Sequence, residues 1–328
     1  MSSVMNTAQA TGAGFSQQIN AVRDVYSAEI FFSALPILKF DQFTTKKTEL
    51  GVQPGTQIQM PRYGNIKRGG KLTEGDRMKT QAMSLTQQAI SVDEYGNAIG
   101  FSERLLNASF YDQLAAASML LGRDLAIVLD LALRDMFAAA VNVIYASTAT
   151  DRSTIAATFV FTTREIKDAV EALETNNAPK WGGDHYIGFI HPHQARGLRD
   201  DAAWINASLY SGAAAIYTGE IGRFEDVRFV TSTVMPNGAN NTTDPATGEF
   251  VDPGYDATLR NQGVGSAVNI YKAVIFGEFA VGHATSLPVE LRDNGGSEDY
   301  GREHGLAWYS IWGQGRLENK NLVVIETA

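Results

Sequence analysis

A long stretch of regularly spaced apolar residues, uninterrupted by proline, most strongly constrains how this chain can fold. Between residues 110 and 146, apolar side chains recur every three, four or seven residues, which is the spacing of one face of an α-helix. These positions are Leu114, Ala117, Leu121, Leu125, Val128, Ala132, Met136 and Val143. We predict a helix of about 37 residues, roughly 55 Å long, that serves as a structural spine. The alternative is two shorter helices broken near Gly122 or Asp135.

The same stretch carries too many charges to cross a membrane. Five charged residues interrupt it, and each would be costly in contact with lipid. They are Arg123, Asp124, Asp130, Arg134 and Asp135. The first thirty residues also lack a basic start followed by an apolar run, so no secretory signal is evident. From these charges we expect a soluble protein. Because the chain contains no cysteine, we expect neither disulfides nor thiolate chemistry.

Positive charge is concentrated in one segment of an acidic chain. Residues 46–79 carry eight basic and three acidic side chains, a net charge of +5, so the remainder of a chain of net charge −9 carries −14. The basic residues are Lys46, Lys47, Arg62, Lys67, Arg68, Lys71, Arg77 and Lys79. A basic segment on an acidic body favours contacts between copies of the chain.

The basic segment lies between two predicted strands. "TQIQMPR" at 56–62 alternates with the period of a strand, and "AMSLTQQAISVDEYGNAIGFS" at 82–102 returns as strand. The bulky positions of the returning strand include Met83, Leu85 and Ile90. We therefore predict a two-stranded excursion over residues 50–100, which is marginally stable in water unless another surface covers it.

The rest of the chain mixes helices and strands, which predicts an α+β fold. A strand over 91–101 leads into a helix that begins at Ser102. The helix over 162–179 is expected to be capped by Thr162 or Thr163, with Glu165 in its first turn. A second short helix is predicted at 191–201, and strands are predicted at 185–190, 224–234, 267–284 and 304–328. Residues 236–265 are rich in turn-forming residues and predict a long polar surface loop.

Catalytic motifs are missing from the sequence. It contains no G-x-S-x-G nucleophile elbow and no glycine-rich phosphate-binding motif. His191 and His193 lie on either side of a proline, and both are residue types that bind metals. Further possible ligands lie nearby in the sequence: Asp184, His185, Asp200 and Asp201. A metal-dependent enzyme therefore stays as an alternative. The acidic group Asp293, Glu298, Asp299 and Glu303 is most simply a solvated edge. The pI of about 5.1 argues against a dedicated nucleic-acid-binding protein. We expect neither an enzyme nor a cofactor.

Several stretches, in order and spacing, resemble a known family. They are "LPILKFDQF", "LTEGD", "VDEYGNAIGFSERL", "LGRDLAIVLDLALRD", "IGFIHPHQARGLRDDAAW", "GEIGRFEDVRFVTST" and "YKAVIFGEFAVG". Together they resemble the major capsid protein family of tailed phages typified by coliphage N-four, over about residues 30–328. "HPHQARGLRDD" followed by "GEIGRFEDVRF" is the most specific part of the resemblance.

The resemblance implies the Hong Kong 97 phage capsid fold and its division of the chain. The first implied parts are an N-terminal arm at 1–45 and an extended E-loop with its base strands at 46–100. A peripheral domain follows at 101–184, with the spine helix at about 110–146, and then an axial domain at 185–283 that includes the polar loop 236–265. C-terminal strands at 284–328 return to the peripheral domain. The short arm leaves no room for a fused scaffold domain, so a separate scaffolding protein is expected.

The implied function is a coat protein that assembles into hexamers and pentamers of an icosahedral shell. The shell would enclose double-stranded DNA without reading its sequence, and it would not bind membranes. Its other partners would be the portal and, where the phage has them, decoration proteins. It would form in the host bacterial cytoplasm. We predict that five basic E-loop residues contact an adjacent subunit: Arg62, Lys67, Arg68, Lys71 and Arg77. Lys67 or Lys71 would be the amine of a covalent lysine–asparagine cross-link, if one forms. The alternative within the fold is an encapsulin, a bacterial nanocompartment shell.

Overall fold

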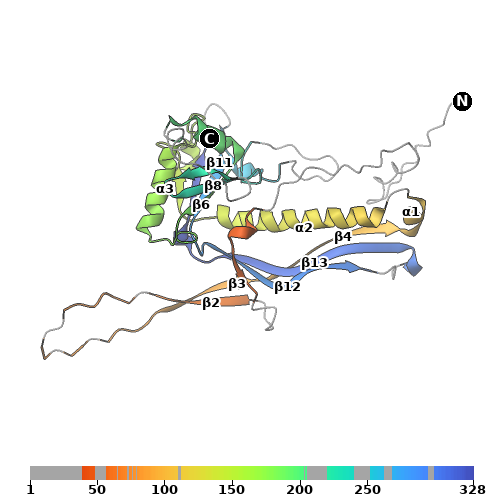
Figure 1. Ribbon diagram of the computed structural model, residues 1–328, viewed down its shortest axis with the longest axis horizontal. Coiled ribbons are helices and arrows are strands. Elements are labelled where there is room, and N and C mark those ends of the chain that lie inside the picture. The colour runs from red at the N-terminus through yellow and green to blue at the C-terminus, as the bar shows by residue number, and fades with distance from the viewer. Residues whose placement is uncertain are drawn as a thin grey trace. The chain divides into compact units, whose positions relative to one another are not determined.

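The computed structural model of the chain is a mixed α+β protein (Figure 1). It describes residues 39–48, 57–64, 66–71, 74–75, 77–78, 80–109, 112–202, 204, 220–239, 252–261, 268–294 and 299–328. Most of the expected N-terminal arm lies outside these residues, as do residues 240–251 and 262–265 of the expected polar loop 236–265.

Two compact units divide the chain. Among the described residues, unit 1 takes those of Gly96–Asp124 and Glu290–Tyr309, and unit 2 takes those of Pro36–Tyr95, Leu125–Val289 and Ser310–Ala328. Four long elements contribute residues to both units: β4 (Asp93–Ser102), α2 (Gln113–Ala138), β12 (Val281–Asp293) and β13 (Glu303–Arg316).

A six-stranded mixed sheet is the centre of unit 2. Its strands follow the order β5-β14-β11-β6-β8-β7. Their bounds are Val143–Tyr145 for β5, Leu322–Thr327 for β14, Tyr271–Phe276 for β11, Tyr186–Ile190 for β6, Val227–Thr231 for β8 and Glu220–Phe224 for β7. The pairs β5–β14 and β6–β8 are parallel, whereas β14–β11, β11–β6 and β8–β7 are antiparallel.

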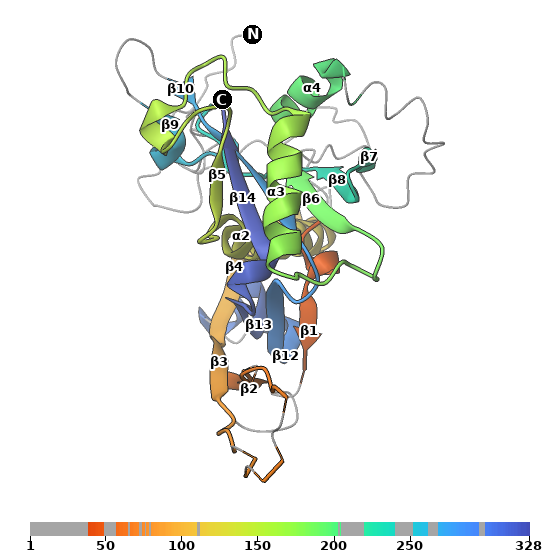
Figure 2. The same cartoon turned by 90° about the vertical axis from the view of Figure 1, so that its left-hand side faces the viewer.

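Helices cover both faces of this sheet, with α3 (Thr163–Thr175) on one face and α2 on the other (Figure 2). Alternate strand residues point to opposite faces, so each strand supplies two cores. On the α3 face, Ile166, Ala169 and Leu173 pack with strand residues such as Phe229, Ile275 and Val323. On the α2 face, Leu133 and Phe137 pack with strand residues that include Ile187, Phe189, Val274, Phe276 and Val324, and with Phe40 and Phe43.

The other described strands form three smaller sheets. One has four strands in the order β1-β12-β13-β4, where β1 (Thr45–Lys47) runs parallel to β12. A second is the antiparallel hairpin of β2 (Gln57–Tyr63) and β3 (Leu85–Ser91), and the third pairs β9 (Arg260–Asn261) with β10 (Val268–Asn269). The remaining described helices are α1 (Glu103–Ala108) and α4 (Pro192–Asp200), with short 3₁₀ turns at Asp41–Phe43, Arg152–Thr154, Ala257–Leu259, Asp299–Gly301 and Asn319–Asn321.

Unit 1 has a small core of its own. Phe101, Leu121 and Trp308 are among its buried side chains. The indole N–H of Trp308 and the side-chain amide of Asn97 both donate to Asp124 Oδ2, each at 2.9 Å. This aspartate therefore connects α2 to β4 and β13 within unit 1.

The predicted helix starts are confirmed. Leu105 N–H donates to Ser102 Oγ at 3.3 Å, so Ser102 caps α1 as expected. Of the two candidates for α3, the cap is Thr162, and its backbone N–H donates to Glu165 Oε2 at 3.0 Å in a capping box.

The predicted length of the long helix is wrong at its C-terminal end. Helix α2 ends at Ala138 after 26 residues, about 39 Å at 1.5 Å per residue. It continues through Gly122 and Asp135, so the alternative of two shorter helices is also wrong. Val143 continues the apolar period but lies in β5, opposite Val324 of β14. The β-branched pair Val143 and Ile144 joins a buried sheet, and this pairing outweighs the helical spacing.

A turn divides the segment predicted as one strand over 224–234. Strand β7 ends at Phe224 and β8 begins at Val227, with Glu225 and Asp226 at φ of 46° and 60° between them. Two consecutive positive φ values define the tight hairpin turn that glycine and asparagine usually occupy. The sequence "FEDVRF" lacks that signal, so the turn was missed.

Candidate assembly surfaces

The predicted basic residues lie in and around the tip of the β2–β3 hairpin. The strands pair from Gln57 opposite Ser91 to Tyr63 opposite Leu85. Lys67, Arg68, Lys71 and Arg77 follow in the connecting loop, with exposed side chains. Within the described residues, these four side chains form no ion pair or side-chain hydrogen bond. Arg62 lies in β2 opposite Thr86, but its side chain falls outside what the structure describes.

Three glycines make room for the base of this hairpin. Ile90 is buried, and a Cβ at Gly282 or Gly315 would lie about 3 Å from its side chain, at 3.0 and 2.9 Å. A Cβ at Gly313 would lie 1.9 Å from the carbonyl oxygen of Ser91, well inside contact distance. The chain at Ile90–Ser91 therefore crosses β12 and β13 at a distance that only glycine permits.

The outer part of the hairpin exposes large apolar side chains that the sequence analysis missed. They are Tyr63, Ile66, Met78, Met83 and Leu85, all more than half exposed. Met83 and Leu85 were recognised only as bulky strand positions, equivalent to Ile90. The sequence does carry a signal for these side chains, because large apolar residues recur in a segment that is otherwise polar and rich in glycine.

A groove of about 630 Å³ lies between the hairpin base and the rest of unit 2. Met60, Pro61 and Gln88 line one side, and Pro179 and Phe279 are among the residues lining the other. The remaining lining residues are Thr175, Asn176, Asn177, Leu317, Glu318, Lys320 and Asn321. With only Glu318 and Lys320 charged, the groove suits packing rather than acid–base chemistry.

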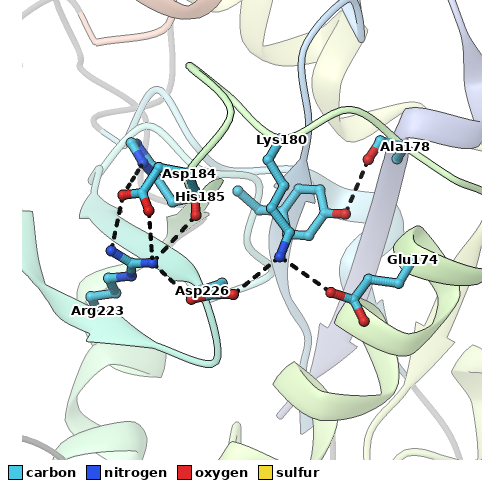
Figure 3. A network of polar contacts seen from close by, with 8 residues as sticks. Glu174, Ala178, Lys180, Asp184, His185, Arg223 and Asp226 are labelled. Carbon is cyan, nitrogen blue, oxygen red and sulfur yellow. Dashed lines mark hydrogen bonds and ion pairs between the residues drawn. The ribbon is translucent and has the colours of Figure 1, made fainter.

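A chain of alternating charges joins the end of α3 to the β7–β8 turn (Figure 3). Lys180 Nζ lies 3.3 Å from Glu174 and 3.0 Å from Asp226. Arg223 in turn lies 2.7 Å from Asp226 and 3.0 Å from Asp184. Hydrogen bonds from Arg223, and next from Lys180, lower the pKa of Asp226. Each charge in this network is partly exposed, so the arrangement orients loops and adds little stability.

His191 and His193 have structural roles in this arrangement. His191 Nδ1 accepts the backbone N–H of His193 at 3.1 Å and caps α4, while the ring of His193 stacks on Tyr271 with centroids 4.4 Å apart. Burial lowers the pKa of His191 to about 4. Within the part of the chain that the structure describes, no third histidine, aspartate or glutamate completes a metal-binding group with them.

The C-terminal acidic group is only partly described. Asp299 lies 3.2 Å from Arg302, both on the surface, and Glu303 is exposed. Glu298 lies outside the described residues. None of the described helices is long and apolar enough to span a membrane.

A comparison with sequence models of protein families matches residues 86–311 to the family described as phage capsid protein. This match covers more than half of the chain. The chain belongs to the phage capsid protein family. The resemblance to phage capsid proteins that the sequence suggested is thereby confirmed.

Solved phage capsids share the fold of this capsid protein at low sequence identity. The capsid of cyanophage Pam1 superposes with a TM-score of 0.72 and 14% identity, over 97% of this chain and 99% of that one. The capsid of Ralstonia phage GP4 superposes with a TM-score of 0.70 and 16% identity, over 97% of this chain and 98% of that one. The capsid of cyanophage P-SCSP1u superposes with a TM-score of 0.68 and 16% identity, over 94% of each chain. No curated protein matches the sequence.

Proposed function

We propose that this capsid protein forms the hexamers and pentamers of an icosahedral shell that encloses the double-stranded DNA of a tailed phage. The observation that supports this most directly is the family match over residues 86–311. The role is structural, and we expect no catalysis. Portal and separate scaffolding proteins are its expected partners, with decoration proteins where the phage has them. Assembly is expected in the cytoplasm of the host bacterium.

Within this proposal the β2–β3 hairpin is the E-loop and α2 is the spine helix. Residues 1–45 are the N-terminal arm, 46–100 the E-loop with its base strands, 101–184 the peripheral domain, 185–283 the axial domain and 284–328 the C-terminal strands. The E-loop assignment is supported by four exposed basic side chains without acidic partners in the described part of their own chain. Lys67, Arg68, Lys71 and Arg77, together with Arg62, would face an adjacent subunit.

The test is direct. Purified protein, expressed with and without a scaffolding protein, is examined by negative-stain electron microscopy and by sedimentation velocity. We expect closed shells or capsomers, and a compact monodisperse monomer under every condition would contradict the proposal. Particles recovered from an infected host should contain double-stranded DNA.

An encapsulin is the alternative within the fold. The family match and the three capsid structures come from phages, which favours the capsid over the nanocompartment. Particles purified from cells that contain an enzyme cargo and no nucleic acid would favour the encapsulin.

A further inference from the structure

We propose that the outer edge of strand β5, together with helix α3, binds an extended basic segment of another protein. The segment would add to the six-stranded sheet as a further strand beside β5, with lysine or arginine side chains facing α3. This inference goes beyond the proposed function, because it identifies a binding surface and the chemistry of its occupant. We call this surface the β5 groove, and its lining includes Val143, Ile144, Asp168, Glu171, Thr175 and Val323.

The β5 groove lies between a sheet edge and a helix of unit 2. Its volume is about 620 Å³, and α3 forms one of its walls. Ile144 and Val323 supply apolar surface, since both pack with the buried side chains on the α3 face of the sheet. The groove therefore offers an apolar floor beside a polar wall, which is the usual character of a binding site.

Strand β5 presents unpaired backbone groups to this groove. In the described sheet order β5 is the edge strand, with β14 as its neighbour (Figure 2). The N–H of Val324 donates to the carbonyl of Asn142 at 2.9 Å, and the N–H of Ala146 donates to β14 at 3.0 Å. Backbone groups alternate in direction along a strand, so those of Val143 and Tyr145 point away from β14. An added strand would find two donors and two acceptors there, which is how peptides extend a sheet.

Helix α3 places acidic side chains without basic partners along the groove. Asp168, Glu171 and Thr175 are spaced by three and four residues, so they lie on one side of the helix. Asp168 lies 4.0 Å from Arg164, at the limit of an ion pair, and Glu171 forms no ion pair with any residue that the structure describes. Asp168 and Glu171 are also the only charged residues among those lining the groove.

The other exposed side of α3 differs, because its charges are paired within the chain. Lys167 lies 3.9 Å from Glu225, and Glu174 lies 3.3 Å from Lys180. Since the same helix satisfies its charges on that side, the unpaired acids along the β5 groove are a local feature of the groove. Charge complementarity therefore points to a basic occupant.

The charge of the chain favours another protein as that occupant. Outside residues 46–79 the chain carries a net charge of −14, so most of a second copy would be repelled by an acidic groove. The remaining candidate from a second copy is the basic segment 46–79, and the binding experiment compares it directly.

A synthetic peptide of alternating lysine and valine tests the inference on the full chain. The peptide is about seven residues long, is blocked at both ends and carries a fluorescent label, and fluorescence anisotropy measures its affinity at low salt. We expect it to bind, and we expect no binding of the same peptide with glutamate in place of lysine. A version with an N-methylated backbone keeps the charges but loses the N–H donors, so it should bind at least about tenfold more weakly.

Matched variants locate the binding. Asp168→Asn with Glu171→Gln should lower the affinity for the lysine–valine peptide roughly fivefold or more, because two acidic partners are lost. Glu174→Gln with Glu225→Gln is the control, since it removes two exposed acids from the other side of α3 and should leave the affinity unchanged. All four substitutions change exposed side chains, so the fold is expected to persist.

Three results would overturn the inference. They are equal affinity of the parent and Asp168→Asn with Glu171→Gln, equal affinity of the N-methylated and unmodified peptides, and absence of binding. Tighter binding of a peptide of residues 64–73 would make the occupant a second copy and would also overturn it. None of these measurements requires particles, so a chain that binds the lysine–valine peptide but never forms shells would overturn the proposed function alone.

Discussion

At the scale of single residues, His191 shows how a buried ring couples folding to pH. Its Nδ1 accepts the N–H of His193, a bond that protonation of Nδ1 would remove. Burial is the main cause of its low pKa, while the charge of Asp252 opposes the shift and His193 adds to it. The ring therefore stays neutral in the folded chain at pH values where it would be charged in the unfolded chain.

We predict that His191 makes the fold sensitive to mild acid. Its pKa falls from 6.5 to about 4 on folding, so its contribution is fully present above pH 6.5 and is lost as pH falls from 6.5 to 4. Over this pH range, the contribution of His191 to the free energy of unfolding should fall by about 2–3 kcal/mol. In His191→Asn, asparagine retains a capping oxygen but cannot titrate, so urea unfolding at pH 7 and pH 4.5 should differ less than in the parent. Equal pH dependence in both proteins would refute this role.

The β7–β8 turn gives a second prediction at this scale. Glu225 has a φ of 46°, which is unfavourable for glutamate and readily adopted by asparagine. Glu225→Asn should raise the free energy of unfolding by about 0.5–1 kcal/mol, measured by thermal unfolding. Glu225→Ala is the control, because it also removes the weak 3.9 Å pair with Lys167 but keeps the unfavourable φ. An equal gain in stability in the alanine variant would show that the backbone conformation of residue 225 is not the cause.

At the scale of elements, the hairpin base depends on close backbone contact. We predict that Gly313→Ala lowers stability by about 1–3 kcal/mol, because its Cβ would lie 1.9 Å from the Ser91 carbonyl oxygen. Gly100→Ala in β4 is the matched control, since its Cβ would meet nothing within 4 Å. Urea unfolding of the two variants measures the difference, and equal stabilities would contradict the close crossing.

In helix α2, a glycine-to-alanine substitution is expected to stabilise the fold rather than weaken it. Gly122 is exposed inside this helix, and a Cβ there would meet nothing within 4 Å. Gly122→Ala should therefore raise the free energy of unfolding of the unassembled chain by about 1 kcal/mol, through helix propensity alone. Thermal unfolding tests this, and a loss of stability would show that the space around Gly122 is occupied.

At the scale of the whole molecule, the charge on the hairpin should act between copies. We predict that Arg68→Glu with Lys71→Glu impairs assembly most strongly at low salt while leaving the subunit folded. Each exposed ion pair contributes only about 0–1 kcal/mol, but every subunit in a closed shell repeats the contact. Sedimentation measures assembly, and circular dichroism checks the fold. Normal particles at low salt would count against the assignment.

Much of the candidate surface could be predicted because it follows from local composition. Lys67, Arg68, Lys71 and Arg77 were expected at an exposed hairpin tip, and they lie there. Their contact with a neighbouring subunit stays a prediction. Which bulky hairpin residues stay exposed could not be predicted, because Leu85 and Ile90 are both apolar strand residues, and the packing of Ile90 against Gly282 and Gly315 decides which one is buried.

By itself, the sequence determined the mixture of helices and strands, the caps at Ser102 and Thr162, and the basic hairpin, because these depend on residues close together along the chain. The tertiary structure decided where α2 ends, that β14 joins β5 and β11 in one sheet, and which bulky hairpin residues are buried. Those outcomes depend on pairing between residues that lie far apart along the chain, and the free energy of that pairing is absent from any local pattern.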